Sequence, residues 1–415
     1  PWRKQALDKC IDWVWEHLQK TEDIYPALAY GAMAFKAYGF SNDSPQIQTA
    51  IGALKRFQQT YDEPILPCMP QNERTVVPSY RRTIHQQCCI SPVWDTPWAL
   101  VALLESDSVS PKDPRLLKTG RWLLSKEVQN PKGDWRFKNP DGPVGGWSFE
   151  FLNEYFPDVD DTIEVIAALE AMALPEAEKR PAIQRGLDWI LSMQNDDGGW
   201  GAFDKNNDLE LVNKIPFADH GACLDPSSPD ITGRALELFL KMGMDKEAKP
   251  IKKAIGYLKK SQEKFGGWFG RWGVNYIYGT WAVLTGLSLL GRNNPLKKQC
   301  DKACRWLLSI QNADGGFSES PESYVTKHYL PYPESVSSQT AWGLMGLVAG
   351  GYQHSLAVQK GVRFLLDHFE NGVWEEKYFT GTGFPGHFYI RYHGYRYYFP
   401  LLALARYQNT INPKF

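Results

Sequence analysis

The sequence predicts an all-α protein, an α/α toroid (barrel) built from repeated helix hairpins around a central apolar cavity. Three observations predict this fold class. A unit made of a helix, a glutamine, a Gly-rich turn and a closing aromatic residue recurs along the chain. Strongly apolar helical segments lie between the copies. Aromatic residues make up 13% of the 415 residues and include 16 tryptophans, more than a core needs for volume alone.

The recurring unit is clearest between residues 180 and 375. Apolar segments such as GTWAVLTGLSLLG separate its copies, so each repeat holds two helices at a spacing of roughly 50–70 residues. Such pairs bury their apolar faces only by stacking on neighbours. The glutamine is expected to bond backbone groups at helix ends, with the aromatic ring stacked over it, in a structural role. The copies end at Trp200, Trp268, Phe317 and Trp374, and an earlier, looser copy, TGRWLLSKEVQNPKGDW, ends at Trp135.

The prolines of residues 60–90 indicate a long loop and a domain boundary near residue 90. Residues 1–58 are expected to form two or three helices. We therefore predict an N-terminal part, residues 1–89, whose helices and Pro-rich loop complete the cavity wall. The second part, residues 90–415, is the predicted helical barrel domain.

Composition and charge exclude several partners. Lys+Arg 46 against Asp+Glu 47 leave a net charge of −1, which argues against nucleic acid and against a polybasic membrane tether. The seven cysteines are odd in number and include no C-x-x-C pair, so we interpret them as reduced cytosolic thiols. The N-terminal residues are typical of an amphipathic helix and unlike a signal peptide. No segment approaches about 18 consecutive apolar residues, so any membrane contact should be peripheral.

Three acids crowd the start of an apolar helical run in YFPDVDDTIEVIAALEAM, residues 155–172. Helix capping explains one of Asp158, Asp160 and Asp161 well, and a second one less well. Crowding and burial raise a carboxyl pKa, so one of these groups could hold a proton and donate it to a weak base such as an alkene. The resulting carbocation needs a dry cavity with aromatic walls, which stabilise cations by up to about 2 kcal/mol each.

Several motifs resemble the squalene-hopene cyclases, which are class II terpene cyclases. They are DVDDT at 158–162, the Gln-to-Trp repeats, SPVWDT at 91–96, GRWGVNYIYGT at 270–280 and GTGFPGHFY at 381–389, and the resemblance covers residues 90–407. It implies a metal-independent, cofactor-free cyclase that protonates a terminal alkene or opens a terminal epoxide. It also implies a hydrophobic polyprenyl substrate drawn from a bilayer, and a cytoplasmic enzyme that associates peripherally with the membrane.

The resemblance also implies roles for particular residues. Asp160 matches the proton donor, with Asp158 and Asp161 as its partners. Positions that match the aromatic lining of the cavity are Trp94, Phe149, Phe203, Trp272, Phe384 and Phe388; further positions in or beside the cavity are Phe217, Tyr278, Tyr392 and Tyr395.

Arg234 departs from the family pattern, because bacterial hopene cyclases commonly have a histidine here that hydrogen-bonds the donor. An arginine beside Asp160 would lower the pKa of that carboxyl. We therefore expect Arg234 to pair mainly with Asp158 or Asp161 and to leave Asp160 protonated between them.

The second departure is length, because only about 90 residues precede SPVWDT. This resembles a compact branch of the family, the merosterolic acid synthase type, which cyclises prenyl chains on an aromatic acid. The favoured substrate is therefore a tetraprenylated aromatic acid that gives a polycyclic meroterpenoid, and the alternative is squalene cyclised to hopene. Arg81, Arg82 or His220 could contact a polar head group. The oligomeric state stays open.

Other classes fit less well. A metal-dependent class I terpene synthase needs a second metal motif after the loose match DDTIE at 160–164, and none follows. A glycosidase with two carboxylates would use acids that the Gly-flanked repeats already explain. A prenyltransferase subunit needs zinc ligands that these Cys and His residues do not supply. A non-catalytic repeat scaffold leaves the acid triad unexplained.

Overall fold

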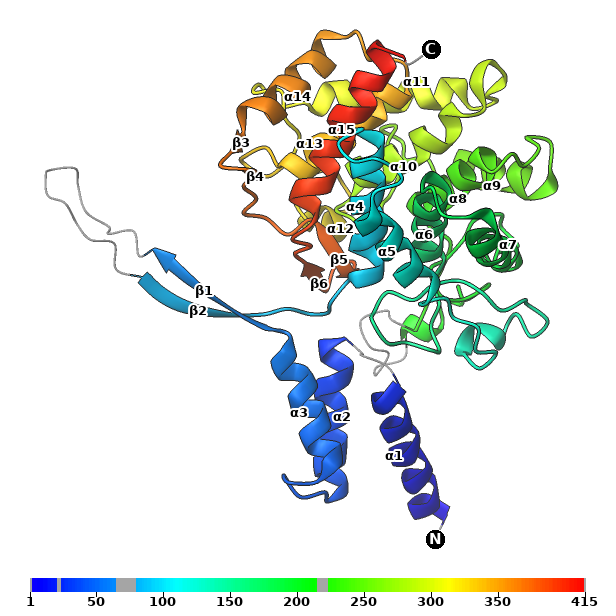
Figure 1. Cartoon of the computed structure of the whole chain (residues 1–415), viewed down its shortest axis with the longest axis vertical. Helices are drawn as coiled ribbons and strands as arrows, with labels where there is room; N and C mark the ends of the chain where they lie inside the picture. The colour runs from blue at the N-terminus through cyan, green and yellow to red at the C-terminus, as the bar shows by residue number, and fades with distance from the viewer. Residues whose placement is uncertain (1, 21–23, 65–79, 215–222, 414–415) are drawn as a thin grey trace, which may run out of the picture. The chain divides into compact units, whose positions relative to one another are not determined.

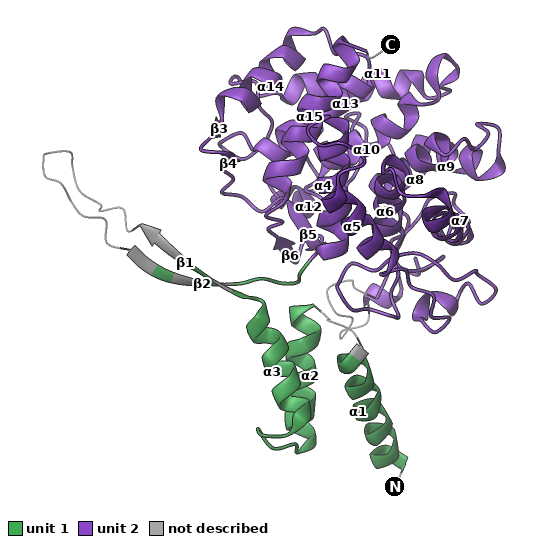
Figure 2. Cartoon of the chain, viewed as in Figure 1, with its two compact units in different colours: residues 1–90 green, residues 91–415 purple. Residues whose placement is uncertain are grey.

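The structure is a computed structural model that describes residues 2–20, 24–64, 80–214 and 223–413. Helices predominate, which confirms the predicted all-α class (Figure 1). The chain divides into two compact units, residues 1–90 and residues 91–415 (Figure 2).

The described residues of the first unit form three helices and a hairpin: α1 (Trp2–Lys20), α2 (Tyr25–Tyr38), α3 (Pro45–Arg56), β1 (Gln58–Pro64) and β2 (Tyr80–Gln86). Its core forms around Leu28, Phe35 and Ile47, all almost fully buried. The hairpin corrects the expected loop over residues 60–90, because β1 and β2 pair antiparallel from Gln58–Gln86 to Pro64–Tyr80. The strands carry β-favouring residues such as Thr60 and Ile84, and Pro64 stands at a strand end where it interrupts no ladder. The other prolines of this segment lie outside the described residues.

The second unit is a double ring of helices (Figure 1). In the described part of the chain, each inner helix packs on the next and the last packs on the first: α4 (Pro92–Glu105), α6 (Val159–Ala171), α8 (Pro229–Lys241), α10 (Tyr276–Ser288), α13 (Ser337–Ala349) and α15 (Tyr395–Ile411). The outer helices that cover them are α5 (Pro114–Leu124), α7 (Glu176–Ser192), α9 (Lys249–Lys260), α11 (Lys297–Ile310) and α14 (Leu356–Asp367). This closed α/α arrangement is the predicted toroid.

Short elements fill the connections between these helices. They are η1 (Asp134–Arg136), η2 (Val212–Lys214), η3 (Gly291–Asn293), α12 (Glu322–Thr326), β3 (Phe369–Glu370), β4 (Val373–Trp374), β5 (Gly381–Phe384) and β6 (Phe388–Ile390). The strands pair as two antiparallel hairpins, β3 with β4 and β5 with β6. β5 also meets the loop before α10 through a bridge between Gly381 and Gly273.

The Gly-rich turns of the predicted repeats join neighbouring helix hairpins. We call such a turn, with its glutamine and its closing aromatic residue, a clasp. Each glutamine amide donates to a carbonyl in its own turn and to a carbonyl in the next outer helix. Gln194 donates to Gly198 (3.0 Å) and Pro250 (2.9 Å), Gln262 to Gly266 (2.7 Å) and Gln299 (2.9 Å), and Gln311 to Gly315 (2.8 Å) and Ala357 (2.8 Å). Gly198 has φ +99°, and a Cβ there would lie 2.4 Å from the Lys253 carbonyl oxygen, so the turn requires glycine.

Hydrogen bonds from both the side chain and the backbone hold the closing tryptophans in place. The indole nitrogens of Trp200 and Trp268 donate to Ile190 and Leu258 of the preceding outer helix, each at 2.8 Å. The backbone N–H groups of Trp200, Trp268 and Phe317 donate to threonine hydroxyls on the following inner helix, those of Thr232, Thr280 and Thr340.

In the first repeat the closing aromatic is Trp147, not the expected Trp135. The Trp147 indole nitrogen donates to the Leu123 carbonyl at 2.7 Å, and its backbone N–H donates to Thr162. Gly145, two residues before it, takes the place of Gly198: it has φ +141°, and a Cβ there would lie 2.9 Å from the Arg185 carbonyl oxygen of the next outer helix. The Gly-Gly-Trp sequence at residues 145–147 carries this role because it supplies that glycine, whereas Trp135 lies in η1.

The ring closes by side-chain contacts between its first and last inner helices. The Trp94 indole nitrogen donates to the Tyr395 hydroxyl at 3.0 Å, and the Tyr398 hydroxyl donates to Asp95 at 2.7 Å. At the other end of the same helices, Arg406 donates to both oxygens of Glu105 at 2.9 and 3.0 Å. The α4–α15 seam therefore joins residues about 300 positions apart in the sequence.

Candidate active site

Three buried aspartates open the inner helix α6. Asp158 is the N-cap, and its Oδ1 accepts a hydrogen bond of 2.7 Å from the backbone N–H of Asp161. Its own N–H donates to the Trp147 carbonyl at 2.9 Å, so the preceding clasp fixes where the helix begins. Asp160 and Asp161 follow in the first turn, where the helix dipole favours negative charge. Capping therefore accounts for Asp158 and leaves Asp160 without a backbone role.

Asp158 and Asp161 form a carboxyl pair. Burial raises the pKa of Asp158 to about 8 and holds the pKa of Asp161 well above its usual range, with mutual repulsion adding to the second shift. Their side chains interact, although Asp158 Oδ2 and Asp161 Oδ1 have no N–H or O–H donor among the described residues. Two buried carboxyls meet favourably only when they share a proton.

Asp160 is bound by Arg234 of α8 in a fork-like, two-bond arrangement. Arg234 Nε donates to Oδ1 at 2.8 Å, and Nη2 donates to Oδ2 at 2.7 Å. The expectation that Arg234 pairs mainly with Asp158 or Asp161 is wrong. Asp158 is held at the helix cap, where it bonds to Asp161. An α-helix turns by about 100° per residue, so Asp160 points in a different direction from both of these acids. It lies on the side of α6 that packs on α8, which carries Arg234.

Two opposing effects act on the Asp160 carboxyl. Burial raises its pKa, the Arg234 charge lowers it, and the result is a pKa of about 6. The nearby carboxylate of Asp230 raises it further. Asp160 can therefore exist in both protonation states near neutral pH, which a proton donor requires.

Aromatic rings surround the guanidinium of Arg234. Its carbon lies 5.0 Å from the centroid of the Tyr278 ring and 5.6 Å from that of the Trp94 ring. Nη1 also donates to the Tyr278 hydroxyl at 2.9 Å. Trp94 in turn donates to Tyr395, so three of the predicted aromatic residues form the buried wall beside the acid.

The other predicted aromatic residues form smaller groups. Tyr392 stacks on Tyr395, with ring centroids 4.6 Å apart, and contacts Phe149 edge-on at 6.2 Å, which extends the wall beside Arg234. Two separate edge-on pairs complete the set, Phe203 with Trp272 at 5.9 Å and Phe384 with Phe388 at 5.3 Å. Phe149 and the members of both pairs are half-buried, so part of each ring stays accessible. Phe217 and His220 lie outside the described residues, as does the side chain of Arg81, while Arg82 is exposed on β2.

Glu164 is a site residue that the sequence reasoning missed. It lies one turn after Asp160, is 5% exposed, and its Oε1 is 3.5 Å from Arg234 Nε. Burial raises its pKa to about 8, against the lowering effect of Arg234. An acid inside the apolar run DDTIEVIAAL was visible in the sequence, but nothing there indicates that α8 supplies a cation opposite it. Among the described residues, no group of three or more His, Cys, Asp or Glu side chains is arranged to hold a metal ion.

Comparisons with known proteins agree over most of the chain. The family model "Squalene-hopene cyclase C-terminal domain" matches residues 90–409, and "Squalene-hopene cyclase N-terminal domain" matches residues 1–63. The squalene–hopene cyclase of Zymomonas mobilis is 40% identical over 421 residues, which cover 98% of this chain and 61% of that protein. The one from Alicyclobacillus acidocaldarius is 46% identical over 327 residues, 78% of this chain and 51% of that protein.

A solved structure with a similar fold is a variant of the type II terpene cyclase MstE from Scytonema, in complex with geranylgeranyl dihydroxybenzoate. It has a TM-score of 0.51 and 16% identity, and the match covers 77% of this chain and 88% of that chain. This likeness supports the toroid fold. The chain spans about three fifths of the length of the Zymomonas relative and about half that of the Alicyclobacillus relative.

Proposed function

Because the chain belongs to the squalene-hopene cyclase family, we propose that it catalyses the proton-initiated, metal-independent cyclisation of a linear polyprene. The observation that carries this proposal is Asp160. It is a buried carboxyl with a pKa near neutrality, set among aromatic rings and bound by a guanidinium that no ordinary pH deprotonates.

In the proposed reaction, protonated Asp160 gives its proton to a terminal alkene carbon. The Asp160 O–H bond breaks, the alkene π electrons form the new C–H bond, and a tertiary cation results. Internal alkenes then attack in turn until a base removes a proton or water adds. Arg234 stabilises the Asp160 carboxylate left behind, in the two-bond geometry described above.

The aromatic residues are proposed to face the successive cations. Trp94, Tyr278 and Tyr395 lie beside the acid, where the first cation forms. The half-buried pairs Phe203–Trp272 and Phe384–Phe388 would offer ring faces farther along the substrate chain. Asp158 and Asp161 are proposed to hold the start of α6, so that Asp160 keeps its position towards α8.

Squalene is the first substrate candidate, because relatives about 40–46% identical over most of this chain are squalene–hopene cyclases. The tetraprenylated aromatic acid that the sequence favoured stays a prediction. The expectation that the N-terminal part completes the cavity wall also stays a prediction. Exposed Trp2, Trp13 and Met33 of the first unit are apolar groups that could rest on a cytoplasmic membrane surface, from which the substrate would come. No described helix is long and apolar enough to cross a bilayer.

The test is a product assay with the purified chain in EDTA. Squalene and a tetraprenylated dihydroxybenzoic acid are supplied separately, and products are analysed by mass spectrometry. Asp160→Asn is compared with Asp141→Asn, which changes an exposed aspartate in the same way. A cyclised product from either substrate that is lost only in Asp160→Asn supports the proposal and names the substrate. Full activity in Asp160→Asn, or a need for metal, would overturn it.

A further inference from the structure

Among the described residues, Arg234 has two carboxyls within 4 Å, those of Asp160 and Glu164, and it carries one positive charge. It binds both oxygens of Asp160 at 2.7–2.8 Å, and Glu164 lies 3.5 Å from the same Nε. Both acids lie on one face of α6, a helical turn apart, and all three side chains are less than 10% exposed. An uncompensated charge is costly in such surroundings, so a buried acid without a partner takes up a proton.

Of the other charged groups around this trio, Asp230 is not neutralised: its Oδ1 has no hydrogen-bond donor among the described residues, and its charge raises the pKa of both Arg234 and Asp160. Asp230 of α8 accepts the backbone N–H groups of Arg271 and Trp272 at 2.9 and 3.1 Å. The remaining groups have partners of their own. Asp158 and Asp161 interact with each other at the start of α6. Lys179 of α7 donates to carbonyls at the far end of α6. Tyr278 of α10 stays neutral, because burial holds its pKa well above its usual range.

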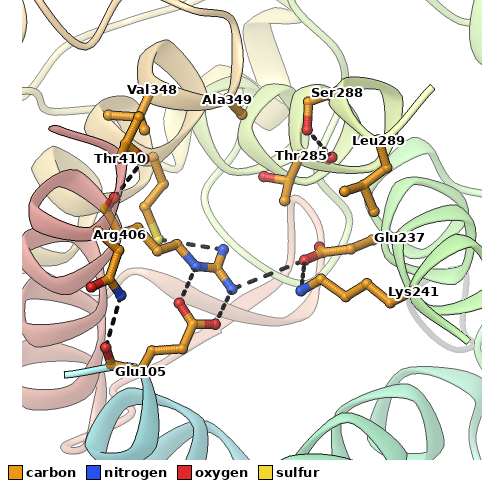
Figure 3. Close-up of a pocket in the computed structure, with 12 residues that line it drawn as sticks. Glu105, Glu237, Lys241, Thr285, Ser288, Leu289, Val348, Ala349, Arg406 and Thr410 are labelled. Carbon is orange, nitrogen blue, oxygen red and sulfur yellow. Dashed lines mark hydrogen bonds and ion pairs between the residues drawn. The ribbon is translucent and has the colours of Figure 1, made fainter. Parts of the chain in front are cut away.

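Beyond Glu164, four charged side chains compensate one another (Figure 3). Arg406 of α15 donates to both oxygens of Glu105 on α4, and Lys241 donates to Glu237 of α8 at 2.6 Å. These two cations and two anions sum to zero. The Arg406 charge lowers the pKa of Glu164 and the Glu237 charge raises it, so the two effects on Glu164 oppose each other. Among the described residues, Arg234 is therefore the cation that lies within 4 Å of both Glu164 and Asp160.

We propose that Asp160 and Glu164 share one proton across Arg234, and that Glu164 is the positioning residue that lets Asp160 be an acid. This inference rests on the proposed function for its catalytic meaning. In one arrangement Glu164 is the carboxylate partner of Arg234 and Asp160 keeps its proton. In the other, Asp160 is the carboxylate bound by Arg234, as in this structure, and Glu164 holds the proton.

This arrangement resolves the difficulty of an arginine beside a proton donor. With Asp160 as the sole carboxyl, Arg234 would favour its ionised form and oppose protonation of an alkene. With Glu164 present, the arginine keeps a partner in either state. When Asp160 transfers its proton to carbon, its carboxylate takes over the guanidinium and Glu164 becomes the unpaired anion. A proton from water, matched by the proton that the cascade releases at its end, then restores the pair. Arg406 and Glu237, whose charges act on Glu164, line a pocket of about 390 Å³, so we expect water to approach from this side (Figure 3).

The first measurement is the pH dependence of turnover in Glu164→Gln, with Glu170→Gln as the matched control on the exposed end of the same helix. Without Glu164, the Arg234 charge acts on Asp160 alone, so the pKa of the donor falls. We expect the alkaline limb of the profile to move at least one pH unit lower, with about a tenfold loss of rate at pH 7 that acid pH restores. Glu164→Asp, which keeps a carboxyl, should recover most of the neutral-pH rate. An unchanged profile in Glu164→Gln would overturn the proposal.

The second measurement does not depend on turnover. Protonated carboxyls absorb in their own infrared C=O region, where other buried acids such as Asp158 and Asp161 also contribute. The band of the Asp160–Glu164 pair is therefore measured as the difference between the spectra of each variant and the wild type. A shared proton means that this band is lost both in Asp160→Asn and in Glu164→Gln, because the remaining acid then ionises against Arg234. If the two acids titrate independently, Asp160→Asn leaves the Glu164 band in place and the proposal fails. Loss of the band in both variants of a chain that cyclises neither substrate would uphold the shared proton and refute the proposed function.

Discussion

Two kinds of buried carboxyl lie near the N-terminal ends of the inner helices. Glu319 accepts the backbone N–H groups of Asn275, Tyr276 and Ile277 at 2.9–3.2 Å where α10 begins, and Glu376 accepts that of Ser338 at 2.5 Å in α13. In the described chain Asp160 accepts from no backbone group, and its contacts are with Arg234. Burial raises the pKa of all three, to about 7 for both glutamates and about 6 for Asp160.

The difference teaches that a raised pKa does not by itself mark the catalytic acid. The glutamates hold helix ends, so removing one leaves buried N–H groups without an acceptor. Asp160 can gain or lose a proton without breaking any backbone hydrogen bond. The acid suited to proton transfer is therefore the one that the backbone does not use.

The largest expected effect separates activity from stability. Asp160→Asn should lower turnover by about 10³-fold, because an amide cannot act as the acid, while the melting temperature stays close to that of the wild type. Glu319→Gln should show the reverse, with near-normal turnover per folded molecule and a lower melting temperature. Product assays and thermal unfolding monitored by circular dichroism measure both. A similar stability loss in the two variants would remove the distinction.

Replacing the cation tests what sets the pKa of Asp160. Arg234→Gln removes the charge that lowers this pKa, so the protonated form should persist to higher pH. We expect the alkaline limb of kcat/KM to move up by at least one unit, opposite to the shift in Glu164→Gln. The maximal rate should fall about tenfold, because the carboxylate product loses its partner. A profile that superimposes on the wild type would show that Arg234 does not tune the donor.

Truncating a capping acid tests the structural half of the comparison. Glu319→Ala leaves three backbone N–H groups at the start of α10 without their acceptor. The free energy of unfolding should fall by about 3 kcal/mol, the order expected for buried donors that lose a charged acceptor. Chemical denaturation measures this loss, and Glu322→Ala, at an exposed position of the following helix, is the control. Equal stability of the two variants would contradict the capping role.

The smallest expected effect, taken per unit of pH, is the pH dependence of stability. An unfolded glutamate releases its proton near pH 4.5, whereas burial keeps the proton on Glu319 up to about pH 7. Between these values the folded state holds more protons, so raising the pH should favour unfolding by about 1.4 kcal/mol per unit for each such group. Glu319→Gln should reduce this slope between pH 4.5 and 7. A melting temperature that rises with pH across the window, with the same slope in the variant, would contradict the assignment.

The repeat architecture could be predicted because it depends on local patterns. In each of three copies the closing aromatic residue follows its glutamine by 6 positions, as in Gln194–Trp200, Gln262–Trp268 and Gln311–Phe317. The hydrogen bonds of the three glutamines repeat in the same way. Trp147 was missed because two candidate aromatics follow α5, and only the left-handed glycine before Trp147 decides between them. The β1–β2 hairpin was missed because prolines dominate the segment, although they lie at or beyond the strand ends.

The candidate site was predictable in part. The resemblance picked out Asp160, but its partner depends on how α6 and α8 rotate against each other, which sequence spacing does not report. Glu164 had no motif to identify it, since an acid in a helical run is normally solvated. Its importance comes from Arg234, which lies 70 residues away in the sequence and on the next inner helix.

The α4–α15 seam has a consequence for synthesis on the ribosome. Trp94 and Asp95 are among the first residues of the ring to emerge, and their partners Tyr395 and Tyr398 emerge about 300 residues later. At 5–20 residues per second, the first helix waits roughly 15–60 s for the helix that covers it. During this time apolar faces of the unfinished barrel are exposed to other nascent chains and to chaperones. Mutations at the seam should therefore cause a large loss in the yield of soluble protein during expression, even where the stability of the finished ring falls only slightly.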